Sequence, residues 1–250
     1  MVHFFISKRV SLYFAVSDFV RQRLYLTHHV GSGKVKTIHL GVNLERFKPM
    51  GGAAAKKALG LPDGKRIFCT VAALIPEKGL QVLFEALSLL LAERKGTAPI
   101  LVIAGEGPYR GELHRRAHDL GITGHIRFLG KRNDIHAVIV ASDIVVVPSV
   151  WEEAFGLVIA EAMACAKPVI ASDTGGIPEL VSSGRTGITV EPCNVRELAN
   201  ALRALIDNQD KAHCMGKAGR EKAIKEFNMA SYIGKISDMY DSVVGRKNTG

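Results

Sequence analysis

From Arg66 onward, short apolar runs rich in β-branched residues alternate with longer stretches whose apolar residues recur at helical spacing. The short runs are mostly apolar, which is typical of strands buried on both faces. The predicted strands are residues 67–72, 100–104, 126–129, 144–147, 169–171 and 187–190. Strands of this kind, each followed by a helix, form a parallel sheet covered by helices on both sides. We therefore predict an α/β fold, with a doubly wound, Rossmann-like parallel sheet.

The two ends of the chain differ from this βα region. Residues 1–48 hold two short strand patterns around one helix, which is too little for a core of its own. We interpret them as the last part of a separate domain, joined to the Rossmann-like domain of residues 49–228 through a glycine-rich linker. Residues 229–250 form a predicted C-terminal helix that follows a break near Asn228.

The composition limits which partners and sites the chain can have. A formal net charge of +9 favours anionic partners such as nucleotides, nucleic acid or an acidic membrane face. No basic tract rich in aromatic residues is present, so nucleic acid is the weaker choice and we expect no nucleic-acid partner. The longest apolar stretch, residues 135–150, is interrupted by Asp143 and is too short to span a bilayer. The cysteines are scattered and form no CxxC pair, which fits a reducing cytoplasm and no zinc site.

Ligands of doubly wound sheets bind beyond the carboxyl ends of the strands, so the loops that follow strands are the places to look for chemistry. In this sequence, five such loops are rich in glycine or in charge. They are residues 76–79, 105–108, 130–132, 148–156 and 173–176. Because the carboxyl ends of parallel strands meet at one edge, these loops predict a shared ligand site.

Glu153 and Glu161 stand eight residues apart around Gly156, at the predicted start of an apolar helix. In a wholly helical segment they would be about 12 Å apart, roughly the reach of a nucleotide sugar. One carboxylate would accept hydrogen bonds from ribose hydroxyls and the other from a sugar, while the backbone N–H groups between them face the diphosphate. Spacing alone favours a simpler interpretation, in which the glutamates complement the helix dipole or solvate a helix face.

Other loop residues also have two interpretations. Lys78 precedes a helix start, where its ammonium would reach a bound phosphate, although surface lysines are common. Gly175 and Gly176 would let a backbone approach a ligand closely, and a tight turn explains them equally well. Glu179 is, in the simpler view, a first-turn acid favoured by the helix dipole.

Two other patterns do not support a site. The GxG at residues 105–107 lacks the third glycine of a dinucleotide fingerprint, because residue 110 is arginine. His114 and His118 have the spacing of two metal ligands on a helix, but no third ligand accompanies them. We therefore expect neither a dinucleotide cofactor nor a metal site.

A longer signature surrounds the two glutamates. The run 153–164 has the form E-x7-E followed by Ala-Met-Ala, and Pro-Val-Ile-Ala at 168–171 and Gly-Gly-Ile-Pro-Glu-Leu at 175–180 come after it. These motifs resemble the donor half of a GT-B glycosyltransferase, specifically the large retaining family called family 4, or glycosyl transferases group 1. The resemblance covers almost the whole chain, because residues 15–20 and 41–49 resemble the segment leading from the acceptor domain into the donor domain.

The resemblance implies a role for each site residue. Glu161 would bind the ribose hydroxyls, Glu153 would contact the transferred sugar, and Lys78 would neutralise phosphate charge as the diphosphate departs. Glu153 and Lys78 are thus the expected catalytic residues. The residues expected to present backbone groups to the sugar or diphosphate are Phe155, Gly156 and Leu157.

The implied reaction transfers a hexosyl group from a nucleoside-diphosphate sugar to a carbohydrate or lipid-linked acceptor, with retention of anomeric configuration. No metal or other cofactor is expected, because a fixed cation and a helix N-terminus stabilise the leaving diphosphate. The resemblance suggests a cytoplasmic enzyme of cell-envelope polysaccharide synthesis. Its basic charge would favour peripheral contact with the inner membrane face.

The chain departs from the family pattern in three ways. Ala73 stands where the family commonly has arginine, so half of the usual phosphate clamp is missing. Ala166 replaces a glycine. Residues 1–48 resemble only the last elements of the acceptor domain, so the resemblance implies that most of that domain is missing, and we expect residues 229–250 to pack back towards it. The alternative is a non-catalytic donor-binding or interaction subunit whose acceptor domain comes from a separate polypeptide. An epimerase or phosphorylase on the same fold is a third interpretation.

Overall fold

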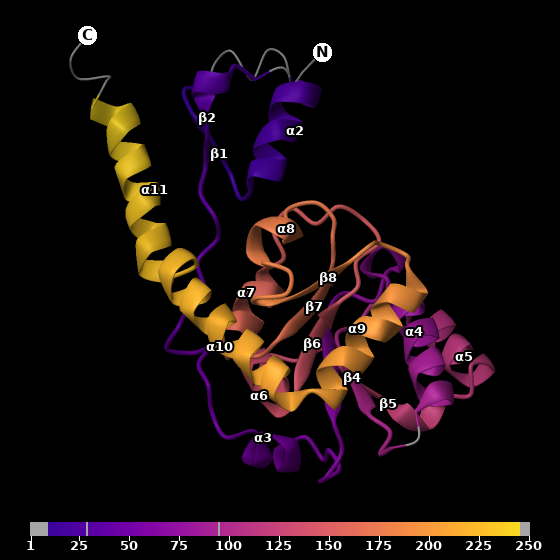
Figure 1. The fold of residues 1–250 in the computed structure, drawn as a ribbon. Helices are drawn as coiled ribbons and strands as arrows, with labels where there is room; N and C mark the ends of the chain where they lie inside the picture. The colour runs from indigo at the N-terminus through magenta and orange to yellow at the C-terminus, as the bar shows by residue number, and fades with distance from the viewer. Residues whose placement is uncertain (1–9, 29, 95, 246–250) are drawn as a thin grey trace.

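The computed structural model of the protein describes residues 10–28, 30–94 and 96–245. Its centre is a parallel sheet of six strands in the order β5-β4-β3-β6-β7-β8 (Figure 1). The strands are β3 (Ile67–Val71), β4 (Ile100–Ala104), β5 (Ile126–Gly130), β6 (Ile144–Val147), β7 (Val169–Ser172) and β8 (Gly187–Val190). All the strands predicted for this region are present, with ends that agree to within one residue. The predicted α/β fold with a doubly wound parallel sheet is confirmed.

Helices cover both faces of the sheet. They are α3 (Gly52–Ala58), α4 (Leu80–Glu93), α5 (Arg110–Asp119), α6 (Ile135–Ala141), α7 (Leu157–Ala164), α8 (Ile177–Leu180), α9 (Val195–Asp207) and α10 (Gln209–Glu226), with the 3₁₀ helices η2 (Pro76–Lys78) and η3 (Thr123–His125). Successive strand residues point to opposite faces. In β3, Ile67 and Cys69 pack into the core that contains α6 and α7, whereas Phe68 packs into the core that contains α4, α5 and α9. Burial on both faces therefore explains why the strands are mostly apolar, and Arg127, which is exposed, lies on the edge strand β5.

The order of the strands places the ligand site. The chain enters the sheet at β3, moves outward to β5, and returns to β6 on the other side of β3. The order therefore reverses between β3 and β6. Ligands of open α/β sheets bind in the crevice that such a reversal leaves at the carboxyl ends of the strands. This crevice lies beyond Val71 and Val147, the last residues of the two strands.

A small N-terminal unit precedes the sheet, and residues 1–9 of the predicted 1–48 lie outside the described ranges. The unit comprises β1 (Tyr13–Ala15), α2 (Asp18–His28), η1 (Ser32–Lys34) and β2 (Val35–Thr37). β1 and β2 form a separate two-stranded parallel sheet. The buried residues Ala15, Val30 and Val35 form a cluster distinct from the two sheet cores. The division of the chain into domains stays a prediction.

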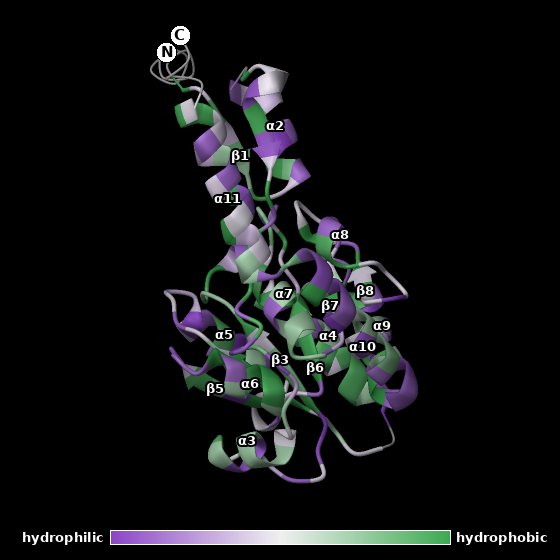
Figure 2. Ribbon diagram, turned by 90° about the vertical axis from the view of Figure 1, so that its left-hand side faces the viewer, coloured by the Kyte–Doolittle hydropathy of each residue, from purple (hydrophilic) through white to green (hydrophobic). Residues whose placement is uncertain are grey.

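α11 (Met229–Val244) begins after a break at Asn228, as predicted, and residues 246–250 of the predicted 229–250 lie outside the described ranges. The Asn228 side chain caps the helix by accepting a backbone N–H at 2.8 Å. Val42 fastens the break, because its N–H donates to Phe227 O at 2.7 Å and its carbonyl accepts from Met229 N–H at 3.1 Å. Beyond the break, α11 runs away from the sheet beside β1 (Figures 1 and 2). In the described ranges, no helix combines the length and the apolar character needed to cross a membrane.

Candidate active site

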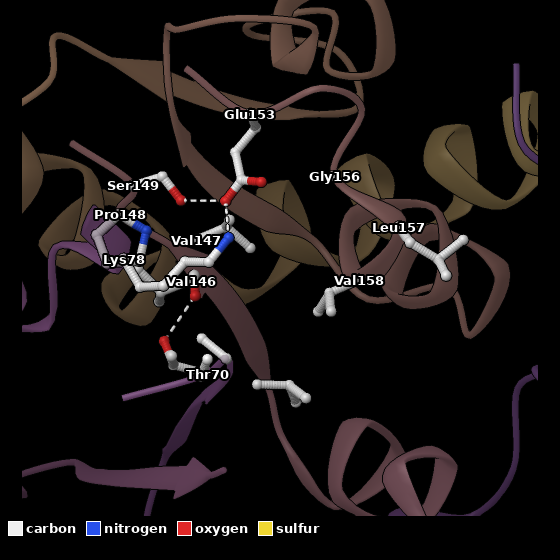
Figure 3. Close-up of a pocket in the computed structure, with 13 residues that line it drawn as sticks. Thr70, Lys78, Val146, Val147, Pro148, Ser149, Glu153, Gly156, Leu157 and Val158 are labelled. Atoms are coloured by element: carbon white, nitrogen blue, oxygen red, sulfur yellow. Dashed lines mark hydrogen bonds and ion pairs between the residues drawn. The ribbon is translucent and has the colours of Figure 1, made fainter. Parts of the chain in front are cut away.

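Two adjoining cavities lie at the carboxyl edge of the sheet, at the reversal of strand order. The first, of about 250 Å³, lies between the ends of β3 and β6 and the start of α7 (Figure 3). The second, of about 730 Å³, extends towards the loops after β4 and β5. The cavities share the lining residues Val71, Ala72, Ala73 and Val158. They are therefore two parts of one cleft, which we call the carboxyl-edge cleft.

Four of the five loops expected at this edge contribute to the lining of the carboxyl-edge cleft. The contributing loops are residues 76–79, 105–108, 130–132 and 148–156. The fifth, residues 173–176, is not part of the lining. It packs behind the loop that carries Glu153, as its hydrogen bonds show below.

The first cavity contains an ion pair between two of the expected site residues. Lys78 Nζ lies 2.5 Å from Glu153 Oε1, and Ser149 Oγ donates to the same oxygen at 2.6 Å (Figure 3). The side chains of Lys78 and Glu153 are 29% and 19% exposed. No described residue donates a hydrogen bond to the other carboxylate oxygen of Glu153, Oε2. Lys78 has three N–H donors and uses one of them on Glu153, so both groups retain capacity for a ligand.

Gly79 explains how Lys78 reaches Glu153. Its φ of +69° ends η2 in the left-handed region, which favours glycine. A Cβ at this position would lie 1.8 Å from Pro148 O, so a side chain would push η2 away from the loop after β6. The same two loops are joined by a hydrogen bond of 2.9 Å from Val150 N–H to Glu77 O. The close contact between the backbones of these two loops therefore brings Lys78 within reach of Glu153.

Gly175 and Gly176 permit a close approach, but by protein backbone and not by a ligand. The Gly176 N–H donates to Glu153 O at 2.7 Å. A Cβ on Gly175 would lie 2.2 Å from that carbonyl oxygen, and one on Gly176 would lie 2.6 Å from Ala154 O. The two glycines therefore support the main chain around Glu153 from behind.

Glu161 lies on α7, three residues after Val158 and on the same side of the helix. It is not part of the lining of either cavity. Because α7 begins only at Leu157, Glu153 lies in the preceding loop and the wholly helical spacing of the two glutamates does not apply. Burial raises the pKa of Glu161 to about 7, and the positive charge of Arg46 opposes this rise. Ionisation of the Glu161 carboxyl group therefore costs free energy unless a further hydrogen-bond donor or cation stabilises the charge.

The three residues expected to offer backbone groups are divided between the cleft and the core. Gly156 and Leu157 line the first cavity. Phe155 lies outside the lining, because its side chain is 3% exposed and packs edge-on against Phe227 with ring centroids 5.7 Å apart. The ring of Phe155 anchors the loop in the core.

Comparison with known proteins decides the family of the chain. Residues 53–222, more than half of the sequence, match the family model described as glycosyl transferases group 1. The chain belongs to this family. The resemblance found from the E-x7-E signature is thereby confirmed at the level of glycosyl transferases group 1.

Individual relatives in the comparison support the same assignment. The GDP-mannose-dependent alpha-(1-6)-phosphatidylinositol monomannoside mannosyltransferase of Mycobacterium tuberculosis is 31% identical over 89% of this chain and 60% of its own length. The D-inositol 3-phosphate glycosyltransferase of Streptomyces avermitilis is 36% identical over 85% of this chain and 47% of its own. The crystal structure of Anabaena HepE in complex with UDP and glucose matches with a TM-score of 0.85 and 28% identity, over 93% of this chain and 63% of that one. The chain thus spans between 47% and 63% of the length of these relatives.

In this group 1 glycosyl transferase chain, sequence reasoning missed two cleft residues. Ser149 holds the carboxylate of Glu153, and Thr70 joins β3 to β6 by donating to Val146 O at 2.6 Å (Figure 3). Ser149 follows a predicted strand, within a loop that was expected to face a ligand. That position was the available signal, because a serine by itself does not differ in sequence from a surface serine.

The described residues contain no cluster of three or more His, Cys, Asp or Glu side chains placed to hold a metal ion. Of the two histidines at metal-ligand spacing on α5, His114 packs against Phe128 with ring centroids 4.3 Å apart, and the side chain of His118 is 88% exposed. The cations that line the second cavity are Lys131 and Arg132. Arg132 holds Asp134 through two hydrogen bonds of 2.7 and 2.6 Å.

Proposed function

We propose that this chain is the donor-binding half of a glycosyltransferase that transfers a hexosyl group from a nucleoside-diphosphate sugar with retention of anomeric configuration. The observation that carries this proposal is the contact between Lys78 and Glu153 inside the carboxyl-edge cleft. A cation and a carboxylate at the reversal of strand order suit a ligand with an anionic phosphate next to a hydroxylated sugar.

The first cavity takes the sugar and the diphosphate. Glu153 Oε2 accepts a hydrogen bond from a sugar hydroxyl, while Lys78 directs its remaining donors to the phosphate. The N-terminus of α7 adds backbone N–H groups at Leu157 and Val158, and its dipole favours negative charge. As the bond between the anomeric carbon and the phosphate oxygen breaks, these groups stabilise the charge that collects on the diphosphate. With this positive charge in place, we expect no metal to be required.

The second, larger cavity takes the nucleoside. Ala73 and Val158 mark its junction with the first cavity. Glu161 lies one turn beyond Val158 on α7, outside the lining of both cavities. In this proposal the ribose extends past Val158 along α7, and its hydroxyls donate hydrogen bonds to the Glu161 carboxylate. Ala73 contributes no charge at the junction, so neutralisation of the diphosphate depends on Lys78, with Lys131 and Arg132 further along the cleft.

Retention requires the acceptor oxygen to form its bond on the face of the sugar from which the phosphate leaves.

The relatives named above act on a phosphatidylinositol mannoside or on inositol 3-phosphate, and one is named for GDP-mannose. HepE was crystallised with UDP and glucose. These names favour a UDP- or GDP-hexose as donor and a carbohydrate or lipid-linked acceptor. The proposed enzyme acts in cell-envelope synthesis in the cytoplasm, where its net charge of +9 favours contact with an anionic inner membrane face.

The alternative is a donor-binding subunit that relies on a separate polypeptide for its acceptor domain. An apolar groove between β1 and α11 favours this alternative. It is lined by Leu12, Phe14, Met239 and Tyr240 among others, and Phe14 and Tyr240 are 45% and 69% exposed. Co-purification of a second chain that occupies this groove would distinguish the subunit from an enzyme that acts alone.

Calorimetry with UDP, GDP and ADP, each alone and as its glucose or mannose derivative, tests the proposal directly. We expect one nucleotide to bind in the micromolar range and its sugar derivative to bind at least as tightly. Mass spectrometry of products formed with glycan or lipid acceptors then identifies transfer, and NMR of the new anomeric centre reports retention. The proposal is wrong if none of the nucleotides binds to folded protein.

A further inference from the structure

The N-terminal half of α2, in the N-terminal unit, is bound to both chain neighbours of Glu153, through Ser17 just before the helix and Arg23 in its second turn. Ser17 Oγ donates to Ala154 O at 2.6 Å and accepts from Val20 N–H at 3.1 Å, so one hydroxyl caps α2 and fastens the loop. Ser17 is fully buried. On the other side of Glu153, the carboxylate of Glu152 lies 2.5 Å from Arg23 Nη2. The loop that carries Glu153 is therefore held by a helix more than a hundred residues away in the sequence.

Glu179 fixes the first turn of α2 from the opposite side. Its carboxylate accepts hydrogen bonds from Asp18 N–H at 2.8 Å and Phe19 N–H at 2.9 Å, and it lies 2.9 Å from His39 Nε2. Glu179 thus caps the N-terminus of α2 and does not merely complement the dipole of α8, on which it lies. Only 21% of its side chain is exposed. Because the carboxylate is largely buried, its charged hydrogen bonds are stronger than they would be in open solvent.

α8 and its leading glycines connect these contacts to Glu153. The Gly176 N–H holds Glu153 O, and Glu179 follows three residues later. A Cβ on Gly176 would lie 3.0 Å from Ser17 Cβ as well as 2.6 Å from Ala154 O. Three segments, at Ser17, Ala154 and Gly176, therefore meet with no space between them. In Figure 1, α8 lies between α2 and the helices that cover the sheet.

We infer that Ser17 and Glu179 are positioning residues, which dock α2 on residues 152–154 and thereby hold Glu153 in the orientation that binds the sugar. This inference rests on the proposed function for the role of Glu153. Lys78 and Ser149 bind only the carboxylate of Glu153. Its own carbonyl is held by Gly176 N–H, and the carbonyl of the next residue, Ala154, is held by Ser17. The position of the N-terminal unit is thus transmitted to the donor site.

The experiment compares Ser17→Ala and Glu179→Gln with Thr27→Ala, which removes a hydroxyl from the same helix that bonds only to Arg23 O. Amide hydrogen exchange at Gly176 is the first measurement, because neither substituted side chain is a partner of that N–H. We expect exchange there to become about five- to tenfold faster in both variants, the factor expected when one supporting hydrogen bond is lost. The Thr27→Ala control should leave it unchanged.

The second measurement is the ratio of affinities for UDP-glucose and UDP, or for GDP-mannose and GDP, by calorimetry. Positioning predicts that the ratio falls about five-fold while the affinity for the nucleotide alone is unchanged. An equal loss for both ligands, or unchanged exchange at Gly176, would overturn the inference. If the wild-type chain binds no nucleotide, the proposed function fails, and exchange at Gly176 still decides whether α2 supports the loop. Arg23→Gln, at a side chain that is 52% exposed, provides the same test should Ser17→Ala not fold.

Discussion

Lys78 and Glu153 face each other across the reversal of strand order, with Nζ and Oε1 2.5 Å apart. Lys78 comes from η2, after β3, and Glu153 from the loop after β6. The two strands are neighbours in the sheet although they are far apart in the sequence. A ligand in the carboxyl-edge cleft therefore meets both charges at once, and neither strand alone creates the site.

Lys78→Met should weaken UDP or GDP binding by about 1.5–3 kcal/mol, the usual contribution of a hydrogen bond to a charged group. The free energy of unfolding should change by less than about 1 kcal/mol, because the ion pair with Glu153 is partly exposed. Calorimetry and urea denaturation measure the two quantities. Lys57→Met, at an exposed lysine on α3, is the control. Equal nucleotide affinity in Lys78→Met and wild type would exclude a phosphate contact.

Ala73→Arg should strengthen binding of the diphosphate. Ala73 lines both cavities at their junction, so a longer side chain there enters the cleft instead of the core. An added guanidinium near the phosphates should raise UDP or GDP affinity about five- to tenfold. The free nucleoside, which lacks phosphate, is the matched ligand and should bind the variant and the wild type equally. A parallel gain for nucleoside and nucleotide would show that the arginine acts elsewhere.

Gly79→Ala should destabilise the fold by about 2–4 kcal/mol. The substitution combines the cost of a left-handed backbone with a Cβ that would lie 1.8 Å from Pro148 O. Gly60→Ala is the control. Gly60 has a φ of +62°, but an added Cβ would meet nothing within 4 Å, so this substitution should cost only about 1 kcal/mol. Chemical denaturation measures both. Equal losses in the two variants would mean that the loops move apart without cost.

Glu161→Ala should reduce the affinity for a nucleotide by about 1.5–3 kcal/mol, since it removes the acceptor proposed for the ribose hydroxyls. The corresponding 2′,3′-dideoxynucleotide lacks those hydroxyls and should bind the variant and the wild type alike. Calorimetry on folded protein checks both ligands. A variant that discriminates between the two nucleotides as strongly as wild type would assign the ribose to another residue.

The sheet was predictable because burial on both faces leaves a direct record in the sequence. The strands from Ile67 to Val190 are mostly apolar, and segments whose apolar residues recur at helical spacing lie between them. The signature around Glu153 and Glu161 indicated the family. The rule that ligands bind at the carboxyl edge placed the loops of Lys78 and Glu153 at one site, and the structure adds the contact between the two side chains.

The supports of the site were not predictable in the same way. The bond from Asp18 N–H to Glu179 links residues 161 positions apart, and it exists only because α2 docks against α8. Periodicity describes which face of an element is buried, but it does not identify the element that covers that face. For the same reason Gly175 and Gly176 were expected to approach a ligand, whereas they approach the main chain of Glu153.

Glu161 should also make stability depend on pH. Burial raises its pKa from 4.5 to about 7, so between these values the folded state binds a proton that the unfolded state has released. The free energy of unfolding should therefore fall as pH rises from about 4.5 to 7 and level off above that, by on the order of 1–3 kcal/mol from this group. Glu161→Gln, which is neutral throughout, should lack this decline when urea denaturation is followed across the same range.

Binding to ribose hydroxyls favours the ionised form, so UDP- or GDP-sugar affinity should rise through pH 7 in wild type and stay level in Glu161→Gln. Parallel pH profiles for the two proteins would show that Glu161 titrates at its ordinary value.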